Sequence, residues 1–340
     1  MARQKKKIHP KKILSLVLVL LIVVFGSIFM YDYAGISSGG NMREVNVKSG
    51  ATTRDIATEL KEEGIIRFPT FFRIISRIGG HDSDYKQGTY MLSEGSGYNK
   101  IFKTLSDGSA AQTVSVKVTI PEGFELRHIA DRLEELGLID RKEFYREIEH
   151  GHFNYPFIDA LPFRENRLEG YLFPDTYEFL KGESAHNIIN AMLARFNEIV
   201  YTQENKARSK ELGMTFDEMV TLSSIVEREA MGDIDRKNVS SVFHNRLKSN
   251  NYPYLQSCAT VQYILKERKT VLSQADTKIK SPYNTYINKG LPPGPIASPG
   301  AKSIEATLYP NDTEYLFFVL GSDGVHHFSK TFDEHLAYGG

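Results

Sequence analysis

Apolar and polar residues follow two different periods along the chain, and together they predict a mixture of helices and strands. Residues 45–47 alternate apolar and polar side chains, which is the pattern of a strand. Residues 53–63 and 68–78 instead place apolar residues at helical spacing. Near the C-terminus, the apolar run at 315–320 predicts a strand that is central in its sheet, and 325–329 is its expected hairpin partner. The pattern therefore predicts an α+β fold.

The strand, helix, helix pattern at residues 45–78 occurs a second time from Val118 onward. Aligned positions keep a constant offset with no gap, and they pair Gly50 with Gly123, Arg54 with Arg127, Ile56 with Ile129, Leu60 with Leu133, Gly64 with Gly137 and Phe71 with Phe144. Chance rarely preserves register over such a length, so we interpret the pattern as an internal repeat. A unit of this kind resembles the LysM-type module, a family that binds glycan chains. For each copy, a role as scaffold alone is the alternative.

A second, weaker similarity follows each copy of the repeat, because residues 88–92 and 175–179 both precede a short turn and a helix. The later copy carries an insertion at residues 168–174, which brings in Glu169 and Tyr171. An aromatic, carboxylate-bearing insertion in a scaffold repeat indicates a site, so both residues are candidates for substrate binding. A plain loop is the alternative.

The segment that follows Thr215 predicts one helix, and its start is marked by a capping box between Thr215 and Glu218. Glu227 falls inside the apolar arc of that helix, whereas Glu229 falls at its edge. A carboxylate on an apolar face is either a general acid, kept partly neutral by desolvation, or the structural partner of a buried arginine. The helix alone leaves both interpretations open.

Three later stretches complete the pattern and supply candidate binding residues. Helices are predicted at residues 185–208 and 239–248, and the second places polar side chains within reach of a carboxylate on the preceding helix. Residues 250–300 are rich in proline and glycine, and tyrosine or asparagine side chains on such a frame suit stacking and hydrogen bonding to sugars. The candidate substrate-binding residues in these stretches are Asn245, Arg246, Gln256, Tyr283, Asn284 and Tyr286.

The N-terminus has a separate character. Residues 1–12 are rich in lysine and arginine, and the run from Ile13 to Met30 holds no charged residue. A run of that length can span a bilayer, and its basic flank stays inside by the positive-inside rule. No clear small-residue cleavage site follows, so we expect an uncleaved single-pass anchor at residues 13–31 and a tether at 32–43. The rest of the chain is then expected outside the membrane.

Composition narrows the classes of function. The chain of 340 residues carries 42 basic and 42 acidic side chains, so it does not have the charge of a nucleic-acid binder. Its single cysteine, Cys258, excludes an internal disulfide and argues against a cysteine-based metal site. The histidines near the C-terminus match no metal-binding spacing. We therefore expect neither a metal nor a cofactor.

Several motifs resemble those of the YceG-like (MltG) family of endolytic murein transglycosylases, in the same order and over nearly the whole chain. They are residues 168–177, 224–229, 242–247, 283–286 and 290–295. The resemblance implies a single membrane helix, a LysM-like subdomain at 44–110 and a mixed α+β catalytic domain at 111–340 that holds a second LysM-like repeat at 116–150. It also implies a bacterial cytoplasmic membrane protein with its N-terminus inside and its catalytic body outside.

The resemblance further implies a reaction. Members of the family cleave nascent peptidoglycan strands between N-acetylmuramic acid and N-acetylglucosamine and leave 1,6-anhydro ends. They are linked to penicillin-binding proteins of the elongation or division machinery and are thought to set glycan length. The catalytic glutamate of the family corresponds to Glu227. One carboxyl suffices when the C6 hydroxyl of the substrate attacks, whereas a hydrolase normally uses two. Glu169 is our candidate for a second, orienting carboxylate, and a structural role is the alternative.

Three alternative functions stand beside this interpretation, and the chain departs from the family pattern at one position. A wall-binding scaffold would bind glycan without cleaving it, and a muramidase would use water as the nucleophile. A pyridoxal phosphate lyase, the old label of some relatives, would need a cytosolic substrate that the anchor does not allow. Many relatives carry Asp where this chain has Cys258. If that Asp binds substrate, binding differs here, and if it caps a turn, the cysteine costs about 1 kcal/mol.

Overall fold

The computed structural model describes residues 26–27, 29–30, 32–35, 42–82, 84–108, 111–112, 115–269 and 271–339. The basic tail predicted at residues 1–12 and most of the anchor predicted at 13–31 lie outside these ranges. Among the described residues, no helix combines the length and the apolar character that a bilayer span needs. The chain divides into unit 1 (Met1–Val116 and Leu180–Ser184) and unit 2 (Lys117–Phe179 and Ala185–Gly340).

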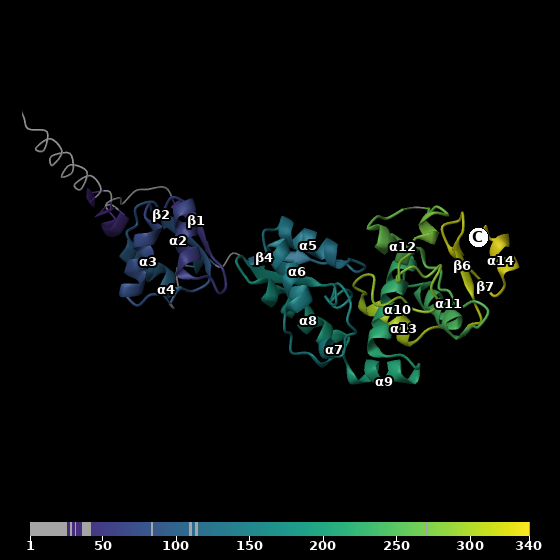
Figure 1. The fold of residues 1–340 in the computed structure, drawn as a ribbon. Helices are drawn as coiled ribbons and strands as arrows, with labels where there is room; N and C mark the ends of the chain where they lie inside the picture. The colour runs from purple at the N-terminus through teal and green to yellow at the C-terminus, as the bar shows by residue number, and fades with distance from the viewer. Residues whose placement is uncertain are drawn as a thin grey trace, which may run out of the picture. The chain divides into compact units, whose positions relative to one another are not determined.

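From β1 onward, the described part of unit 1 combines a three-stranded sheet with the helices α2, α3 and α4 (Figure 1). Its elements are β1 (Met42–Val47), α2 (Thr53–Glu62), α3 (Pro69–Ile78), β2 (Gly88–Ser93), α4 (Tyr98–Asp107) and β3 (Ala111–Gln112). β2 lies between β1 and β3 and is antiparallel to both. Val45 and Tyr90 turn inward from the sheet and join Leu60 and Phe72 from the helices in one core. The two helices predicted from the pattern are confirmed to within one residue at each end.

A helical segment that precedes β1 packs on unit 1. Asp32 is buried, and its Oδ2 accepts the N–H groups of Arg67 at 2.6 Å and Phe68 at 3.1 Å, just before α3 begins. The rings of Phe29 and Phe71 lie 4.9 Å apart, which joins the segment to α3. The tether predicted at residues 32–43 is therefore fixed to the unit at its start.

Unit 1 also takes up a later part of the chain, Leu180–Ser184. The Gly182 carbonyl accepts the Ser49 N–H at 2.9 Å, and Lys181 forms an ion pair with Glu44 at 3.3 Å. Gly182 has a φ of +81°, and a Cβ there would lie 2.4 Å from Asn46 Oδ1, so the position requires glycine. Unit 1 is thus built from two separate parts of the sequence.

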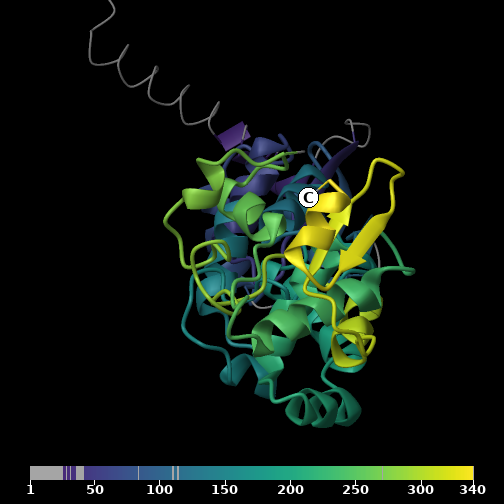
Figure 2. The same ribbon diagram turned by 90° about the vertical axis from the view of Figure 1, so that its right-hand side faces the viewer.

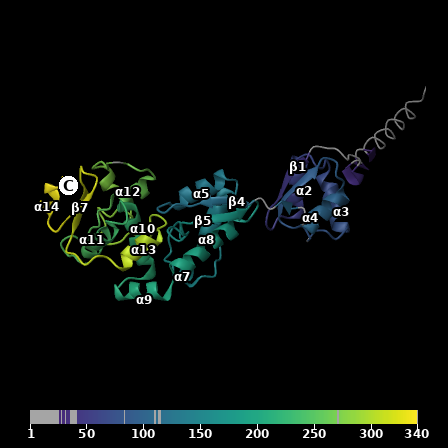
Figure 3. The same ribbon diagram turned by 180° about the vertical axis from the view of Figure 1, so that it is seen from behind.

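The first half of unit 2 repeats the element order of unit 1 (Figure 3). It contains β4 (Ser115–Thr119), α5 (Leu126–Glu135), α6 (Arg141–His150), the short α7 (Pro156–Asp159), β5 (Thr176–Leu180) and α8 (Ala185–Ile199). β4 pairs with β5 as β1 pairs with β2, and α5 occupies the positions aligned with α2. Gly50 and Gly123, which are aligned, both have a φ of +73°. The two aligned segments thus share an order of elements and a turn geometry, and their interpretation as LysM-like repeats remains a prediction.

The second half of unit 2 is organised around α10 (Phe216–Glu229), which Figure 1 labels, and Figure 2 shows this half in green and yellow from another side. The other elements are α9 (Gln203–Glu211), α11 (Arg236–Lys248), α12 (Cys258–Leu265), the 3₁₀ turn η1 (Asp276–Lys278), α13 (Ala301–Leu308), β6 (Phe317–Leu320), β7 (His326–Ser329) and α14 (Phe332–Ala337). α9, α11, α12 and α13 all contact α10. Leu222 and Val226 of α10 pack against Val239 and Phe243 of α11.

Three details differ from the sequence prediction. The helix predicted at 185–208 is two helices, because Thr202 starts a new one by accepting the Asn205 N–H at 3.1 Å. The turn-rich stretch at 250–300 contains α12, which turn residues on both sides conceal. The predicted hairpin is confirmed, but among the described residues β6 pairs with β7 alone and is not a central strand. Phe318 of β6 instead packs against Phe243 of α11, with 5.8 Å between the ring centroids.

Candidate active site

α10 sets the position of the candidate catalytic carboxylate. Thr215 begins the helix as predicted, since its Oγ1 accepts the Glu218 N–H at 3.1 Å and Glu218 Oε2 accepts the Thr215 N–H at 2.8 Å. Every residue from Met219 to Val226 is buried, which fixes the rotation of the helix in unit 2. Glu227 follows directly in the last turn, and it is half-buried.

Glu227 lies between two glycines. The Gly300 N–H donates to Glu227 Oε2 at 3.0 Å, and Gly300 is the residue that precedes α13. A Cβ on Gly123 would lie 3.7 Å from Glu227 Cγ. The start of α13 therefore directs a donor at one carboxyl oxygen. Within the part of the chain that the structure describes, no group donates to the other oxygen, Oε1.

A second carboxyl group, that of Glu122, lies beside Gly300. A Cβ on Gly300 would fall 1.8 Å from Glu122 Oε1, so this carboxyl lies directly against Gly300. Desolvation and then the charge of Glu227 raise the pKa of Glu122, while Arg236 and Lys302 act in the opposite direction. Two carboxyl groups thus meet at Gly300, and a proton on Glu122 relieves the repulsion between them.

Backbone hydrogen bonds hold both glycines in place. The Gly123 N–H donates to the Ser298 carbonyl at 2.8 Å, and the Ser298 N–H donates to the Phe124 carbonyl at 2.7 Å. The Ile296 N–H donates to Ser224 Oγ on α10 at 3.0 Å. The segment before α13 is therefore tied to α10 on one side and to the loop before α5 on the other. The two carboxyl groups share a rigid backbone frame.

The two glutamates in the last turn of α10 have different surroundings. Glu229 Oε1 accepts a hydrogen bond from the Ser257 hydroxyl and another from the Ala259 N–H at 3.0 Å, at the start of α12. Glu229 is therefore committed to holding α12. Glu227 has no donor on Oε1 among the described residues, so it is the better placed of the two to meet a substrate.

Arg228 joins the last turn of α10 to the start of α5. Its Nη1 lies 3.1 Å from Glu125 Oε1, and the two side chains are only 5% and 2% exposed. Arg127 pairs with the other oxygen of Glu125, with 2.6 Å between Nε and Oε2. The last turn of α10 is thus fixed to the second copy of the repeat by a three-membered ion cluster in which Arg228 and Glu125 are buried and Arg127 is partly exposed.

A cavity of about 630 Å³ lies beside this ion cluster, and its lining includes Glu125, Arg127, Glu169, Tyr263 and Tyr283. Glu169 Oε1 accepts the Leu126 N–H at 3.0 Å, and Oε2 accepts the Tyr263 hydroxyl at 3.3 Å. Burial and then the charge of Glu125 raise the pKa of Glu169 to about 8. The carboxyl of Glu169 therefore carries a proton at neutral pH. The cavity offers a neutral acid, a guanidinium group and two aromatic rings, which suits a polar sugar.

The structure places Glu169 and Tyr283 at this cavity and three other predicted residues elsewhere. Asn245 Nδ2 donates to the carbonyls of Thr313 at 2.8 Å and Tyr315 at 2.9 Å. Arg246 lies over the Phe317 ring at 5.0 Å, and it donates to backbone carbonyls and, at 2.9 Å, to Gln256 Oε1. The prediction that Asn245 or Arg246 reaches the carboxylate on α10 is not met, because the segment around β6 occupies their donors.

The remaining predicted residues are structural or peripheral in their contacts. Tyr171 is fully buried, and its hydroxyl donates to Asp217 Oδ1 at 2.6 Å. Asn284 is fully buried as well, and its amide donates to the carbonyls of Thr277 and Ile279. The Tyr286 hydroxyl lies 3.1 Å from the sulfur of Cys258. Tyr286 thus lies against Cys258.

No metal site stands out in the described residues, where no group of three or more His, Cys, Asp and Glu side chains is arranged to hold an ion. His326 instead pairs with Asp235, with 2.6 Å between Nδ1 and Oδ2. The described residues bring carboxyl groups and backbone N–H groups to the site, with a cavity beside them.

Sequence reasoning missed Glu122, and the repeat contained the signal that could have found it. The residue before the turn glycine is Ser49 in the first copy and Glu122 in the second. A carboxylate that replaces a small polar residue at an aligned turn is a departure from the scaffold, like the insertion at 168–174. The contact with Gly300 could not be foreseen, because it joins residues far apart in the sequence.

Comparisons with known proteins agree with this geometry. The profile of the YceG-like family matches residues 45–339. A protein of Bacillus subtilis named endolytic murein transglycosylase is 34% identical over 86% of this chain and 82% of its own length. A Streptococcus pneumoniae protein of the same name is 28% identical over 95% of this chain, which spans 63% of that longer relative. The crystal structure of a yceG-like protein from Listeria monocytogenes matches with a TM-score of 0.58 and 33% identity, over 87% of this chain and 98% of the other.

Proposed function

This chain belongs to the YceG-like family, and from that premise we propose a mechanism in which Glu227 is the general acid and base of a lytic transglycosylase. The enzyme class follows from the relatives, which are named endolytic murein transglycosylases. The substrate is accordingly peptidoglycan. The observation that carries the role of Glu227 is its geometry, in which the Gly300 N–H holds Oε2 while Oε1 has no donor among the described residues.

Oε1 of Glu227 suits a mechanism in which one carboxyl group acts first as general acid and then as general base. Since Oε2 accepts the Gly300 N–H, the proton of the acid form belongs on Oε1, facing the substrate. Oε1 gives this proton to the glycosidic oxygen as the bond from that oxygen to C1 of the muramic acid breaks. The C6 hydroxyl of the same sugar then bonds to C1 and gives its proton to Oε1. No water enters, the product is a 1,6-anhydro end, and the attack gains from being intramolecular.

Glu122 is a positioning residue in this scheme. Its carboxyl touches Gly300, whose N–H orients Glu227, and its raised pKa favours a neutral neighbour for Glu227. The cavity beside the Arg228–Glu125 pair is the proposed seat for sugars next to the cleaved bond, with Glu169 and Tyr283 as contacts. Tyr171 and Asn284 support this seat from within the core and do not enter it.

The location and the biological role complete the proposal. The uncharged run at residues 13–30 and the basic residues before it support a single-pass anchor with the body outside the cytoplasmic membrane. In that place the enzyme meets nascent strands, so it can terminate their elongation beside the penicillin-binding proteins that make them. The two repeat copies are proposed as LysM-like modules on the strength of their recurring order of elements.

Digestion of uncrosslinked glycan strands by the full chain in detergent, with mass analysis of the ends, tests the mechanism. We expect 1,6-anhydro ends, and a loss of about 10²–10⁴-fold in rate for Glu227→Gln, the contribution typical of a general acid. Glu229→Gln, two residues further along α10, is the matched control. Reducing ends would instead indicate a muramidase. If both the unchanged chain and Glu227→Gln bind glycan and neither cleaves it, the result would support a wall-binding scaffold.

A further inference from the structure

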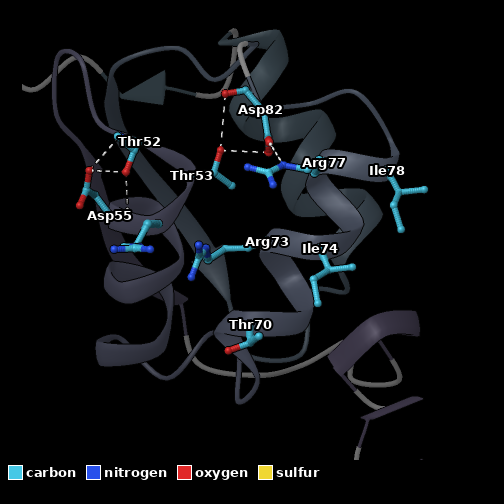
Figure 4. A pocket seen from close by; sticks show the side chains of 10 residues that line it. Thr52, Thr53, Asp55, Thr70, Arg73, Ile74, Arg77, Ile78 and Asp82 are labelled. Carbon is cyan, nitrogen blue, oxygen red and sulfur yellow. Dashed lines mark hydrogen bonds and ion pairs between the residues drawn. The ribbon is translucent and has the colours of Figure 1, made fainter.

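An apolar stripe with arginines beside it runs along the outer face of α3 in unit 1. Phe71, Ile74 and Ile78 are 36%, 48% and 81% exposed, and they recur at helical spacing on one side of the helix. Figure 4 shows Ile74 and Ile78 projecting from α3 beside a hollow between α3 and the start of α2. Large apolar side chains gathered on one exposed face are typical of a surface that meets a partner or a membrane.

The hollow beside the stripe is cationic. It has a volume of about 800 Å³, and its lining includes Arg54, Arg73 and Arg77. Its two carboxylates are already engaged, because Asp55 accepts the Thr52 N–H and hydroxyl, and Asp82 accepts the hydroxyls of Ser76 and Thr53 and pairs with Arg77. Arg54 and Arg73 form no ion pair among the described residues. The hollow therefore presents two guanidinium groups to an anion.

The second copy of the repeat shows that the scaffold does not need this stripe. At the α6 positions aligned with Thr70, Ile74 and Ile78 the chain carries Glu143, Glu147 and Gly151. Phe144, which is aligned with the exposed Phe71, is fully buried. The same strand and helices thus form with a polar outer face in one copy and an apolar, basic face in the other.

The stripe begins where the chain leaves the predicted anchor. Phe29, whose ring lies 4.9 Å from that of Phe71, is the penultimate residue of the uncharged run that ends at Met30. Asp32 then fixes the segment to the backbone just before α3. If the run at 13–30 spans the bilayer, the start of α3 is held at the membrane surface.

We propose that the outer face of α3 lies on the membrane, with Phe71, Ile74 and Ile78 entering the headgroup region and Arg54 and Arg73 binding anionic phospholipid headgroups. This rests on the proposed anchor and adds a second attachment that sets the orientation of unit 1. Amphipathic helices with basic residues beside an apolar stripe bind membranes in this way, about 5–10 Å into the boundary between headgroups and acyl chains. Each arginine near an anionic surface strengthens such binding by about fivefold.

A single tryptophan reports this contact, since the chain has no native tryptophan. The full chain carrying Ile78→Trp is reconstituted into vesicles of phosphatidylglycerol and phosphatidylcholine, with and without brominated acyl chains. We expect a blue-shifted emission that the bromines quench. Met91→Trp is the matched control, because Met91 is 37% exposed on β2, between the inward-facing Tyr90 and Leu92, and so on the far face of the sheet. Its emission is expected to stay unquenched.

Arg54→Gln combined with Arg73→Gln, added to the Ile78→Trp chain, is expected to remove the dependence of quenching on the phosphatidylglycerol content. Chain that floats with the vesicles but shows no quenching at position 78 contradicts the α3 contact and leaves the anchor standing. Chain that does not float at all contradicts both. An emission change caused by soluble glycan strands and not by lipid would assign the hollow to glycan and overturn the proposal. Quenching that persists in a Glu227→Gln background keeps this result separate from the catalytic assignment.

Discussion

The two copies of the repeat are built on one scaffold and are put to different uses. Both place a glycine with a φ of +73° between a strand and a helix, at Gly50 and Gly123. A Cβ at Gly50 would meet open space, whereas at Gly123 it would lie 3.4 Å from Arg228 and 3.7 Å from Glu227. The residues that start the next helices differ as well, with Thr52 in one copy and Glu125 in the other. A few side chains at aligned turns thus separate the first copy from the copy that borders the candidate active site.

The largest expected difference between the copies lies at these two helix starts. Thr52→Ala removes a helix cap and is expected to lower the free energy of unfolding by about 1 kcal/mol. Glu125→Ala leaves Arg228 buried without its partner, and it is expected to cost about 3–5 kcal/mol. Urea unfolding followed by circular dichroism measures both. Glu125→Thr, which gives the second copy the cap of the first, should recover little of the loss. Equal losses for Thr52→Ala and Glu125→Ala would break the comparison.

Glu169 belongs to the insertion that only the second copy has, and it predicts a pH dependence. Its pKa is raised from 4.5 to about 8, so the folded chain holds a proton that the unfolded chain releases near pH 4.5. Stability is therefore greatest below that value and falls as the pH rises toward 8, by about 1 kcal/mol per pH unit. Glu169→Gln is expected to flatten this decline. Thermal unfolding between pH 5 and pH 7 gives the slope, and parallel slopes for the two proteins would contradict the prediction.

The two turn glycines provide a smaller, matched test. Gly50→Ala and Gly123→Ala both force a side chain into a left-handed conformation, at an expected cost of about 1–2 kcal/mol each. Relief of that strain at position 123 moves the hydrogen bonds to Ser298 and displaces Glu122, so cleavage is expected to fall by roughly tenfold. Gly50→Ala should leave cleavage unchanged. The measurement is the rate of strand cleavage at a temperature where both variants are folded, and a comparable loss in the two would argue against a special role for the second turn.

The smallest expected effect concerns the outer faces of α3 and α6. Ile74→Glu gives α3 the residue that α6 has at the aligned position, Glu147. Because Ile74 is 48% exposed, the free energy of unfolding in detergent solution is expected to change by no more than about 0.5 kcal/mol. A loss of several kcal/mol would show that the stripe stabilises unit 1 itself. Urea titration with Thr70→Glu as a second aligned exchange measures this.

Local signals in the sequence predicted the elements of the site well. The capping box of Thr215 and Glu218 and the apolar period of α10 place Glu227 in its last turn, and the repeat gives the order of the elements around it. These features depend on neighbours within a few residues, so a single sequence contains them. The short helix α12 is missed because the prolines and glycines around it dominate the pattern.

Contacts between segments that lie far apart in the sequence could not be predicted from the sequence alone. Glu122 meets Gly300 through backbone hydrogen bonds that join a loop before α5 to a loop before α13, and no periodicity records them. Arg246 was predicted to face the carboxylate on α10, but helical phase gives only its side of the helix. The position of the Arg246 side chain is set by the hydrogen bond from its Nε to the Leu316 carbonyl, at 2.6 Å, and by its contact with the Phe317 ring. Side chains of this length find partners that only the folded chain supplies.

The assignment of the segment Leu180–Ser184 to unit 1 has a consequence for the order in which the protein forms during synthesis. Unit 1 begins near the N-terminus, yet the Ser49 N–H finds its acceptor, the Gly182 carbonyl, only after residues 117–179 have been made. As the chain emerges from the ribosome or a translocation channel, unit 1 therefore waits for a segment that arrives more than half-way through the sequence. The strand pair β4 and β5 must close in the same interval, since β5 ends at Leu180. The two copies of the repeat are thus finished together, although one precedes the other in the chain.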